Sequence, residues 1–430
     1  MDLPKGWVSC HLSDASEIIA GQSPESKHYN EDGIGVPFFQ GKADFGQLYP
    51  KNRVYCTAPK KIAESGDILL SVRAPVGPTN LAKGTVAIGR GLHAIRPLSG
   101  ITTRYVLYFF KHIEPVFSGQ GMGTTFSAVN VDDVKNLNLS LPPLAEQHRI
   151  VEKVDALFSK LDNGVEMLQV IRQQLRTYRQ AVLKWAFEGN LTNSTWKMVS
   201  LGKVADDIKI GPFGTLLHKE DYIKGGMPVI NPKHMREYRI CNDDSVSITE
   251  EKAAELQSYI ICENDVLIAR RGEMGRTVYV SKRENGWLCG TGSMIIRLSR
   301  EHTGRLYAYL LSSEQSRRYL IDNCSGTTMS NLNEKIIKGL PIPIIPVDEQ
   351  QSLLAEIESR LSVCEKLEAL INENLAKAET LKQSILKKAF AGQLVPQDPN
   401  DEPAEKLLAR IKAEQAAKVP AKPARRKKSG

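Results

Sequence analysis

Leu141-Pro-Pro-Leu-Ala-Glu-Gln147 opens a segment that closes with Leu183-Lys-Trp-Ala-Phe-Glu-Gly-Asn-Leu191, and the chain contains this segment twice. The second copy opens with Ile344-Ile-Pro-Val-Asp-Glu-Gln350 and closes with Leu386-Lys-Lys-Ala-Phe-Ala-Gly-Gln-Leu394. The two openings and the two closings are separated by the same 203 positions. The segments therefore have equal length, as a spacer of fixed length requires.

Each copy has the pattern of one long helix. Proline lies at its start, where the first-turn N–H has no partner anyway, and glycine lies at its end, where it suits a left-handed cap. Between them apolar residues recur at steps of mostly three and four with charged residues interspersed, which is typical of a coiled-coil seam. Residues 144–188 as one helix would be roughly 65 Å long. The alternative is a pair of ordinary core helices, which average only about three turns.

The composition limits the class of protein. The chain has 430 residues, of which 41% are hydrophobic and 25% charged, enough for two or three globular domains. We expect no membrane association, because there is no long apolar run and no charged-then-apolar leader. Seven cysteines without a Cys-x-x-Cys pair suit a reducing cytoplasm and offer no zinc site. Six of the eight net positive charges lie in residues 418–428, so net charge alone does not establish DNA binding.

The repeat continues outside the two helices. Segment 66–77 matches segment 263–275, and this match places Arg73 on Arg271. A Gly-Thr-Thr turn follows in both copies, while the loops between matches differ in length. The expected layout is a first globular domain at 1–142, a spacer helix at 143–192, a second globular domain at 193–345, a second spacer helix at 346–395, and a short helix with a basic disordered tail at 396–430.

The globular parts combine strands and helices. Short apolar runs at 67–72 and 266–269 predict buried strands, and the spacing over 102–113 and 303–319 predicts helices. The expected fold class is therefore α+β, with two similar mixed domains that are separated by two long helices and related by a pseudo-two-fold repeat. Under that symmetry, the segment before Trp7 should lie where the second long helix ends.

The sequence holds no convincing catalytic or metal-binding pattern. The glycines of 119–123 imitate a nucleotide-binding loop, but the second copy keeps only one of them. Asn231-Pro-Lys-His234 begins like the signature of amino-methyltransferases and then departs from it. The eight histidines show no metal-ligand spacing. We expect a binding protein that is not an enzyme and has no catalytic, cofactor or metal site of its own.

The candidates for DNA contact are basic residues and threonines. The planar fork of arginine suits both phosphate and the guanine edge, and the Gly-Thr-Thr turns offer N–H and hydroxyl groups to phosphates. The Gly- and Pro-containing stretches 21–46 and 211–232 resemble each other least and are predicted to be irregular surface loops that differ in recognition. The structural alternatives are surface ion pairs for the arginines and simple turns for the threonines. The candidates are Arg73, Thr124, Thr125, Lys209, Lys219, Lys233, Arg270, Arg271, Arg276, Thr327 and Thr328.

The order and duplication of these motifs resemble those of the specificity subunit of type I restriction-modification enzymes. The resemblance rests on the proline-containing helix starts, the Ala-Phe-x-Gly-x-Leu ends, the Gly-Thr-Thr turns and the initial Leu-Pro-Lys-Gly-Trp7, and it covers nearly the whole chain. It implies two target-recognition domains, each reading one half of a bipartite asymmetric sequence in double-stranded DNA. It also implies that the long helices form an antiparallel coiled coil that fixes the gap between the half-sites.

The resemblance further implies partner subunits in a bacterial cytoplasm. Two methyltransferase subunits would use S-adenosylmethionine, and restriction subunits would use ATP and Mg, so that catalysis belongs to the partners. The alternative is a bivalent coiled-coil scaffold whose domains bind protein rather than DNA. The candidates for subunit docking or for the spacer itself are Glu146, Gln147, Leu161, Leu168, Phe187, Glu349, Gln350, Leu361, Leu375 and Phe390.

Overall fold

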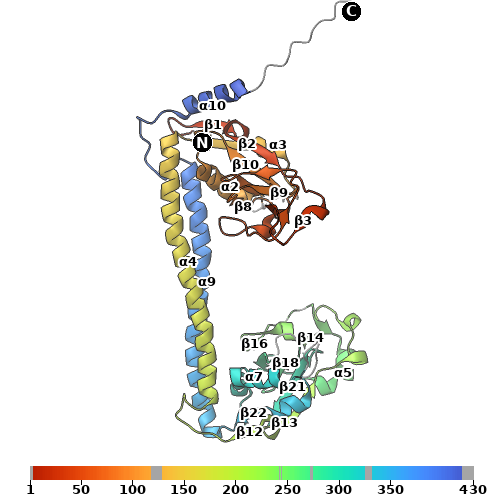
Figure 1. Cartoon of the computed structure of the whole chain (residues 1–430). Coiled ribbons are helices and arrows are strands. Elements are labelled where there is room, and N and C mark those ends of the chain that lie inside the picture. Colours follow the sequence, from red (N-terminus) through yellow and green to blue (C-terminus); the bar gives the residue numbers. More distant parts are fainter. Residues whose placement is uncertain are drawn as a thin grey trace, which may run out of the picture. The chain divides into compact units, whose positions relative to one another are not determined.

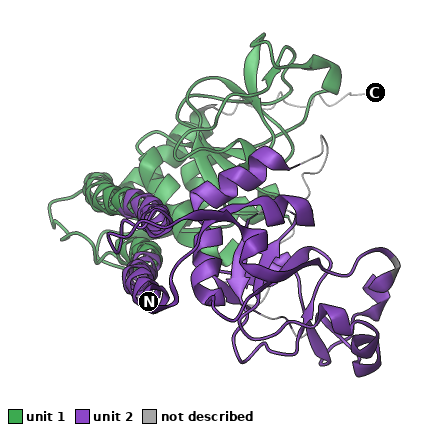
Figure 2. Ribbon diagram, turned by 90° about the horizontal axis from the view of Figure 1, so that it is seen from below, with its two compact units in different colours: residues 1–167, 374–430 green, residues 168–373 purple. Residues whose placement is uncertain are grey.

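The computed structural model describes residues 3–117, 128–241, 243, 245–271, 275–324 and 332–418 (Figure 1). The chain divides into two compact units, with residues 1–167 and 374–430 in unit 1 and residues 168–373 in unit 2 (Figure 2). Each unit holds one mixed domain and one half of each long helix, α4 (Leu144–Phe187) and α9 (Val347–Phe390). Both helices have 44 residues, which confirms their equal length, and the α+β fold class is also confirmed. No helix in the described ranges is long and apolar enough to cross a membrane.

Unit 1 contains a four-stranded sheet in the order β2-β10-β7-β8, a five-stranded sheet in the order β3-β5-β4-β9-β6, and the pair β1-β11. Its other helices are α1 (Leu12–Ala15), α2 (Thr103–Phe117), α3 (Val131–Lys135) and α10 (Ala404–Lys418), with 3-10 turns at Ser26–His28 and Lys42–Asp44. Its strands are β1 (Val8–His11), β2 (Ser16–Ala20), β3 (Tyr29–Asn30), β4 (Val36–Phe39), β5 (Tyr55–Cys56), β6 (Ile62–Ala63), β7 (Ile68–Ser71), β8 (Thr79–Leu81), β9 (Val86–Ile88), β10 (Leu92–Pro97) and β11 (Asn138–Leu141).

Unit 2 contains a four-stranded sheet in the order β13-β21-β18-β19, a three-stranded sheet β17-β14-β20, and the pairs β15-β16 and β12-β22. Its other helices are α5 (Glu250–Glu255), α6 (Gly304–Leu311), α7 (Glu314–Asn323) and α8 (Glu334–Gly339), with 3-10 turns at Leu201–Lys203, Gly214–Leu216, Lys219–Asp221, Pro232–His234 and Gln257–Tyr259. Its strands are β12 (Met198–Ser200), β13 (Ala205–Ile210), β14 (Met227–Ile230), β15 (Met235–Arg236), β16 (Arg239–Ile240), β17 (Ser247–Ile248), β18 (Val266–Ala269), β19 (Thr277–Tyr279), β20 (Leu288–Cys289), β21 (Ser293–Leu298) and β22 (Pro341–Pro343).

The two four-stranded sheets share one frame. In both, the central strands are antiparallel, and the strand predicted from the sequence (β7 or β18) is buried along its whole length. A buried aspartate precedes that strand and accepts two hydrogen bonds from an arginine of the neighbouring strand. The Asp67–Arg96 distances are 2.9 and 2.8 Å, and the Asp265–Arg297 distances are 3.0 and 2.8 Å. Paired in this way, a buried carboxylate keeps its charge satisfied, so the repeat extends to the internal ion pair of each domain.

Two local predictions were wrong. The segment 303–319 is not one helix, because α6 ends at Leu311 with Ser312 as its C-cap. Ser313 then caps α7 by accepting a hydrogen bond from the Ser316 N–H. The stretches 21–46 and 211–232 are not wholly irregular either. They contain β4 and β14, which pair in parallel with β9 and β20 and so build the second sheet of each domain.

The N-terminal segment lies at the end of α9, as the repeat predicts. Gly392 has a positive φ, and a side chain there would come within 2.3 Å of Pro4. The Ala404 N–H donates to the Gly6 carbonyl oxygen at 2.9 Å, which ties the start of α10 to the N-terminal segment. In the other copy, Gly189 has the same backbone geometry. There the chain continues directly into the second domain.

Candidate functional site

An open hollow of about 850 Å³ in unit 1 brings together side chains suited to nucleic acid. Arg73, just after β7, lines it together with Gln40, Lys42 and Arg90. Arg73 is exposed, while the Ser71 hydroxyl donates to the carbonyl oxygens of Arg73 (3.2 Å) and Pro75 (3.0 Å) and so fixes the turn. Guanidinium and amide groups can form paired hydrogen bonds with guanine and adenine edges.

Of these residues, the sequence analysis predicted only Arg73 and missed Gln40, Lys42 and Arg90. Gln40 and Arg90 line the same hollow as Arg73. Gly91 allows this arrangement, because a side-chain carbon at position 91 would lie only 2.1 Å from the Gln40 carbonyl oxygen. The Gly-Arg-Gly sequence at 89–91 was the available signal, since glycines on both sides allow a close backbone approach. Nothing in the sequence alone linked that turn to Arg73.

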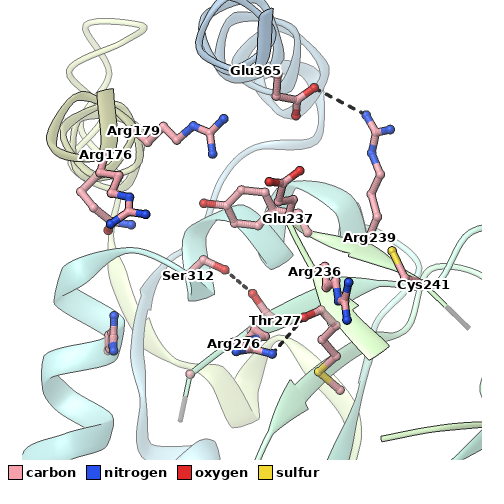
Figure 3. A pocket seen from close by; sticks show the side chains of 15 residues that line it. Arg176, Arg179, Arg236, Glu237, Arg239, Cys241, Arg276, Thr277, Ser312 and Glu365 are labelled. Carbon is pink, nitrogen blue, oxygen red and sulfur yellow. Dashed lines mark hydrogen bonds and ion pairs between the residues drawn. The ribbon is translucent and has the colours of Figure 1, made fainter. Parts of the chain in front are cut away.

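An open basin of about 1030 Å³ in unit 2 is lined by arginines from several elements (Figure 3). Two acidic residues, Glu237 and Glu365, also line it. We call this set the arginine basin: Arg176 and Arg179 from α4, Arg236 and Arg239 from the β15-β16 hairpin, Arg276 before β19, and Arg317 from α7.

The hairpin turn sets two of the basin arginines side by side. Glu237 and Tyr238 both have positive φ, 46° and 64°, so the turn is tight and Arg236 lies directly opposite Arg239 in the strand pair. The Tyr238 ring packs on Tyr309 at a centroid distance of 4.8 Å, and burial raises its pKa to about 12. The hairpin is therefore fixed to the core, while its arginines remain exposed.

The three arginines predicted near β18 and β19 have different surroundings. Arg270 donates to the Leu332 carbonyl oxygen at 2.8 Å, and burial, followed by the neighbouring Arg271 charge, lowers its pKa. Arg276 donates to the carbonyl oxygens of Pro232 and Met235, both at 3.2 Å. Arg270 and Arg276 thus hold backbone segments in place, whereas Arg271 is exposed.

The predicted lysines are at the surface. Lys209 donates to the Ser258 carbonyl oxygen at 3.3 Å, and Lys233 pairs with Asp243 at 3.1 Å. Lys219 is exposed in a 3-10 turn. The threonines at 124, 125, 327 and 328 lie outside the described residues.

The acidic residues at the helix starts each accept a hydrogen bond from a tryptophan. Glu146 accepts a hydrogen bond from the Trp7 indole N–H at 3.0 Å, and Glu349 accepts one from Trp196 at 2.9 Å. Glu146 is only 1% exposed, and its desolvation raises its pKa in spite of the hydrogen bond from Trp7. These contacts join each long helix to the start of a domain.

The neighbouring glutamines have a matching role. Gln147 accepts from the Thr102 N–H at 3.0 Å, and Gln350 accepts from the Thr303 N–H at 2.9 Å. Both amides are buried and also donate to backbone carbonyl oxygens, Gln147 to that of Pro142 and Gln350 to that of Ile345. All four residues therefore anchor the helix within its own unit. Glu146, Gln147 and Gln350 are buried and offer no surface to a docking partner, whereas Glu349 is half-buried.

The apolar spacer candidates lie on or near the seam. Phe187 and Leu361 are buried in the core of unit 2. Phe390 contacts the Tyr105 ring at 5.1 Å and stacks on His112 at 5.2 Å in unit 1. Three further candidates are half-buried: Leu161, Leu168 and Leu375.

These features define a class of protein: a recognition chain with two mixed domains of one fold, each attached to the same kind of helix start, and with different exposed side chains on each. The chain belongs to the family whose model is described as the type I restriction modification DNA specificity domain, which matches residues 4–173 and 193–378. Membership in this family favours the DNA-specificity hypothesis over the protein scaffold.

Relatives extend over the whole chain. The StySPI type I restriction enzyme specificity subunit of Salmonella potsdam is 26% identical, and the match covers 99% of both chains. The relative from Methanocaldococcus jannaschii named as the MjaX specificity subunit is 34% identical over 197 residues, 45% of either chain. A chain from a solved structure on complex assembly and conformational transition of the type I R-M system shares the fold, with a TM-score of 0.71 at 21% identity, over 91% of this chain and 100% of that one.

Proposed function

We propose that this chain is the DNA sequence-specificity subunit of a type I restriction-modification enzyme and reads a bipartite, asymmetric target. Each domain binds one half-site in double-stranded DNA, and the paired helices set the gap between the half-sites. The chain carries no catalysis. Two methyltransferase subunits bring S-adenosylmethionine, and restriction subunits bring ATP and Mg.

The observation that supports this function best is the duplication itself. Each domain has the same four-stranded sheet, aspartate–arginine pair and helix anchor, but the exposed side chains near the equivalent strand ends differ. In unit 1 Gln40 follows β4 and Arg90 lies just after β9, whereas Asn231 and Thr291 occupy the corresponding positions after β14 and β20. Arg73 and Arg271 are the shared element. Two copies of one frame with different contact groups suit a target with two unlike halves.

The candidates divide into base readers and phosphate binders. Arg73 and Arg271 are proposed to reach base edges, since they are exposed after the equivalent strands. Lys219 and Lys233 are proposed to contact phosphates, as are the two Gly-Thr-Thr turns. Arg270 and Arg276 are proposed to shape the surface rather than to touch DNA, because their guanidinium groups hold backbone carbonyl oxygens.

Methyltransferase docking is proposed to use the outer faces of the long helices. In unit 2, α4 and α9 leave large apolar side chains exposed, including Val170 (52%), Val363 (53%) and Leu370 (52%). Large exposed apolar side chains on paired helices support a protein-binding surface there. We propose this surface for docking in place of the buried Glu146, Gln147 and Gln350, while the half-buried Glu349 stays a candidate.

A methylome tests the function. The chain is expressed with its methyltransferase subunit in a host without other DNA methylation, and modified bases are mapped by long-read sequencing. A two-part motif with a fixed gap is expected. An unmodified genome, despite an active purified complex, would favour the scaffold, which would also lack the steep salt dependence of phosphate contacts.

A further inference from the structure

We infer that the arginine basin of unit 2 is a clamp for the sugar-phosphate backbone of duplex DNA, which holds the DNA beside one half-site against the spacer helix. This inference rests on the proposed function, but it assigns a distinct role to a distinct set of residues. The basin grips the DNA without reading its sequence. Bases are read by the neighbouring strand ends.

The charge of the basin requires an anion. Six arginines line it against two glutamates. One arginine of the set, Arg179, is neutralised by Glu368 at 2.9 Å, and Arg239 lies 4.0 Å from Glu365. Within the part of the chain that the structure describes, Arg176, Arg236 and Arg317 have no acidic partner at ion-pair distance. Arginines that outnumber the neighbouring carboxylates attract phosphate, whose oxygens match the guanidinium fork.

The three unpaired arginines come from separate walls of the basin. Arg176 lies on α4 and Arg236 on the hairpin (Figure 3). Arg317 lies on α7, and all three side chains are exposed. Two sets of contacts fix the walls before DNA binds. Arg276 donates hydrogen bonds to carbonyl oxygens of the β14-β15 connection, and Tyr238 packs on Tyr309. A site whose walls are already fixed loses little entropy when it binds a rigid duplex.

The size and position of the basin favour duplex DNA. Its volume of about 1030 Å³ exceeds what one phosphate group fills and suits a stretch of backbone. Gly275 lines the basin and lies only four positions after Arg271 in the sequence, which limits the distance between the basin and the proposed base reader. Base edges in a groove are flanked by phosphates, and a base reader beside a phosphate grip fits this arrangement.

Unit 1 carries the opposite charge at two of the equivalent positions. The equal helices place Glu379 where unit 2 has Arg176. A side chain added at Gly77 would meet Glu114, whereas one added at the equivalent Gly275 would meet Arg317. Two arginines of the clamp are therefore glutamates in the other copy, and the clamp belongs to the second half-site alone.

The clamp connects the DNA to the helix that sets the spacing. Arg176 lies on α4 itself, so a phosphate bound there is positioned relative to the spacer and not only relative to the recognition domain. The clamp thereby fixes the register of the gap on one side of the target.

The test compares the methyltransferase complex containing R176Q/R236Q/R317Q with wild type. Binding to the mapped target and to unrelated duplex is measured over a range of salt concentrations. We expect the salt slope to fall by about 0.9 for each phosphate that the variant no longer neutralises, and the affinity for both duplexes to fall roughly tenfold or more. The methylated motif should not change. The conservative R176K/R236K/R317K variant should recover much of the slope.

The control is R318Q, since Arg318 is exposed on α7 next to Arg317 but lies outside the basin and pairs with Glu314 at 2.6 Å. It should leave the slope unchanged. An unchanged slope in the triple variant, with the wild-type motif intact, would overturn the clamp and leave the proposed function standing. A changed motif would identify base readers instead, and loss of the methyltransferase subunit would identify an acidic protein surface as the occupant. If wild type gives no two-part motif, the proposed function itself fails.

Discussion

The hydrogen bond between Trp7 and Glu146 illustrates how single residues hold each helix to its domain. Burial raises the pKa of Glu146 above its ordinary value of 4.5, so the folded protein binds this proton more tightly than the unfolded chain does. The stability from this group is complete below the ordinary value and is lost as pH rises through the raised pKa. At neutral pH the charged Glu146 carboxylate therefore lowers the stability of the folded protein.

Glu146→Gln should remove this titration while keeping an oxygen for the Trp7 N–H. The variant should be at least as stable as wild type at neutral pH and should lose that advantage as pH falls toward 4.5. Glu146→Ala leaves the buried indole unpaired and should cost about 1–3 kcal/mol in the free energy of unfolding. Urea unfolding measures both. Glu349→Ala is the matched control and should cost less, because Trp196 is more exposed than Trp7.

Arg73 and Arg271 give a matched pair of specificity variants. Arg73→Gln should cost about 1–3 kcal/mol in binding and relax the preference at one position of one half-site. Arg271→Gln should do the same in the other half. Competition binding with single-base variants of the target is the measurement. Uniform weakening across all sequences would identify phosphate contacts instead.

The sequence alone could not distinguish the arginines that are proposed to contact bases from those that hold backbone segments in place. Arg270, Arg271 and Arg276 look alike in the chain, but two of them bind backbone carbonyl oxygens of residues far away in sequence, such as Leu332 and Pro232. Only folding brings those carbonyl groups near. For the same reason, the sequence could not predict that Gln40 and Arg73 line the same hollow.

Among the elements, the long helices were the most predictable. Their length, start and end follow from an uninterrupted three-four pattern bounded by proline and glycine. The second sheets were missed because β4-β9 and β14-β20 pair over only two residues each and lie far apart in sequence. The break between α6 and α7 was missed because Ser313 continues a helical spacing while its hydroxyl caps a new helix.

The outer faces of the helices give a prediction on assembly. Val363→Lys places a charge on the exposed apolar surface of α9 and should weaken methyltransferase binding at least tenfold with little change in stability. Co-purification and sedimentation measure the assembly. Ser362→Lys adds the same charge one position away and should assemble normally. Equal loss in both variants would show that added charge, not the apolar surface, is responsible.

For the whole molecule, the duplication predicted the order of domains and helices. It also predicted that each long helix ends beside the start of a domain. Pro4 lies against Gly392, where the second helix ends, while the first helix passes through Gly189 into the second domain by continuous chain. At the junction after Gly189 the chain is therefore continuous. At the corresponding junction after Gly392, the N-terminal segment is held by noncovalent contacts instead.

A chain whose ends are joined and then reopened near Asn193 should keep the same target. Opening there breaks one junction and makes the other covalent, and Asn193 is exposed in a turn. The permuted chain should co-purify with the methyltransferase subunit and give an unchanged methylome. Loss of soluble complex from several such permutants would count against the symmetric frame.

The division into units also affects the order in which the two units can fold during translation. Unit 2 is one uninterrupted stretch, whereas unit 1 combines the first 167 residues with those from 374 onward. On the ribosome, residues 1–167 emerge before unit 2 but lack their half of α9 and the helix α10 until unit 2 has been synthesised. The second domain can thus complete its fold before the first, and during translation the unfinished N-terminal unit is the part most in need of a chaperone.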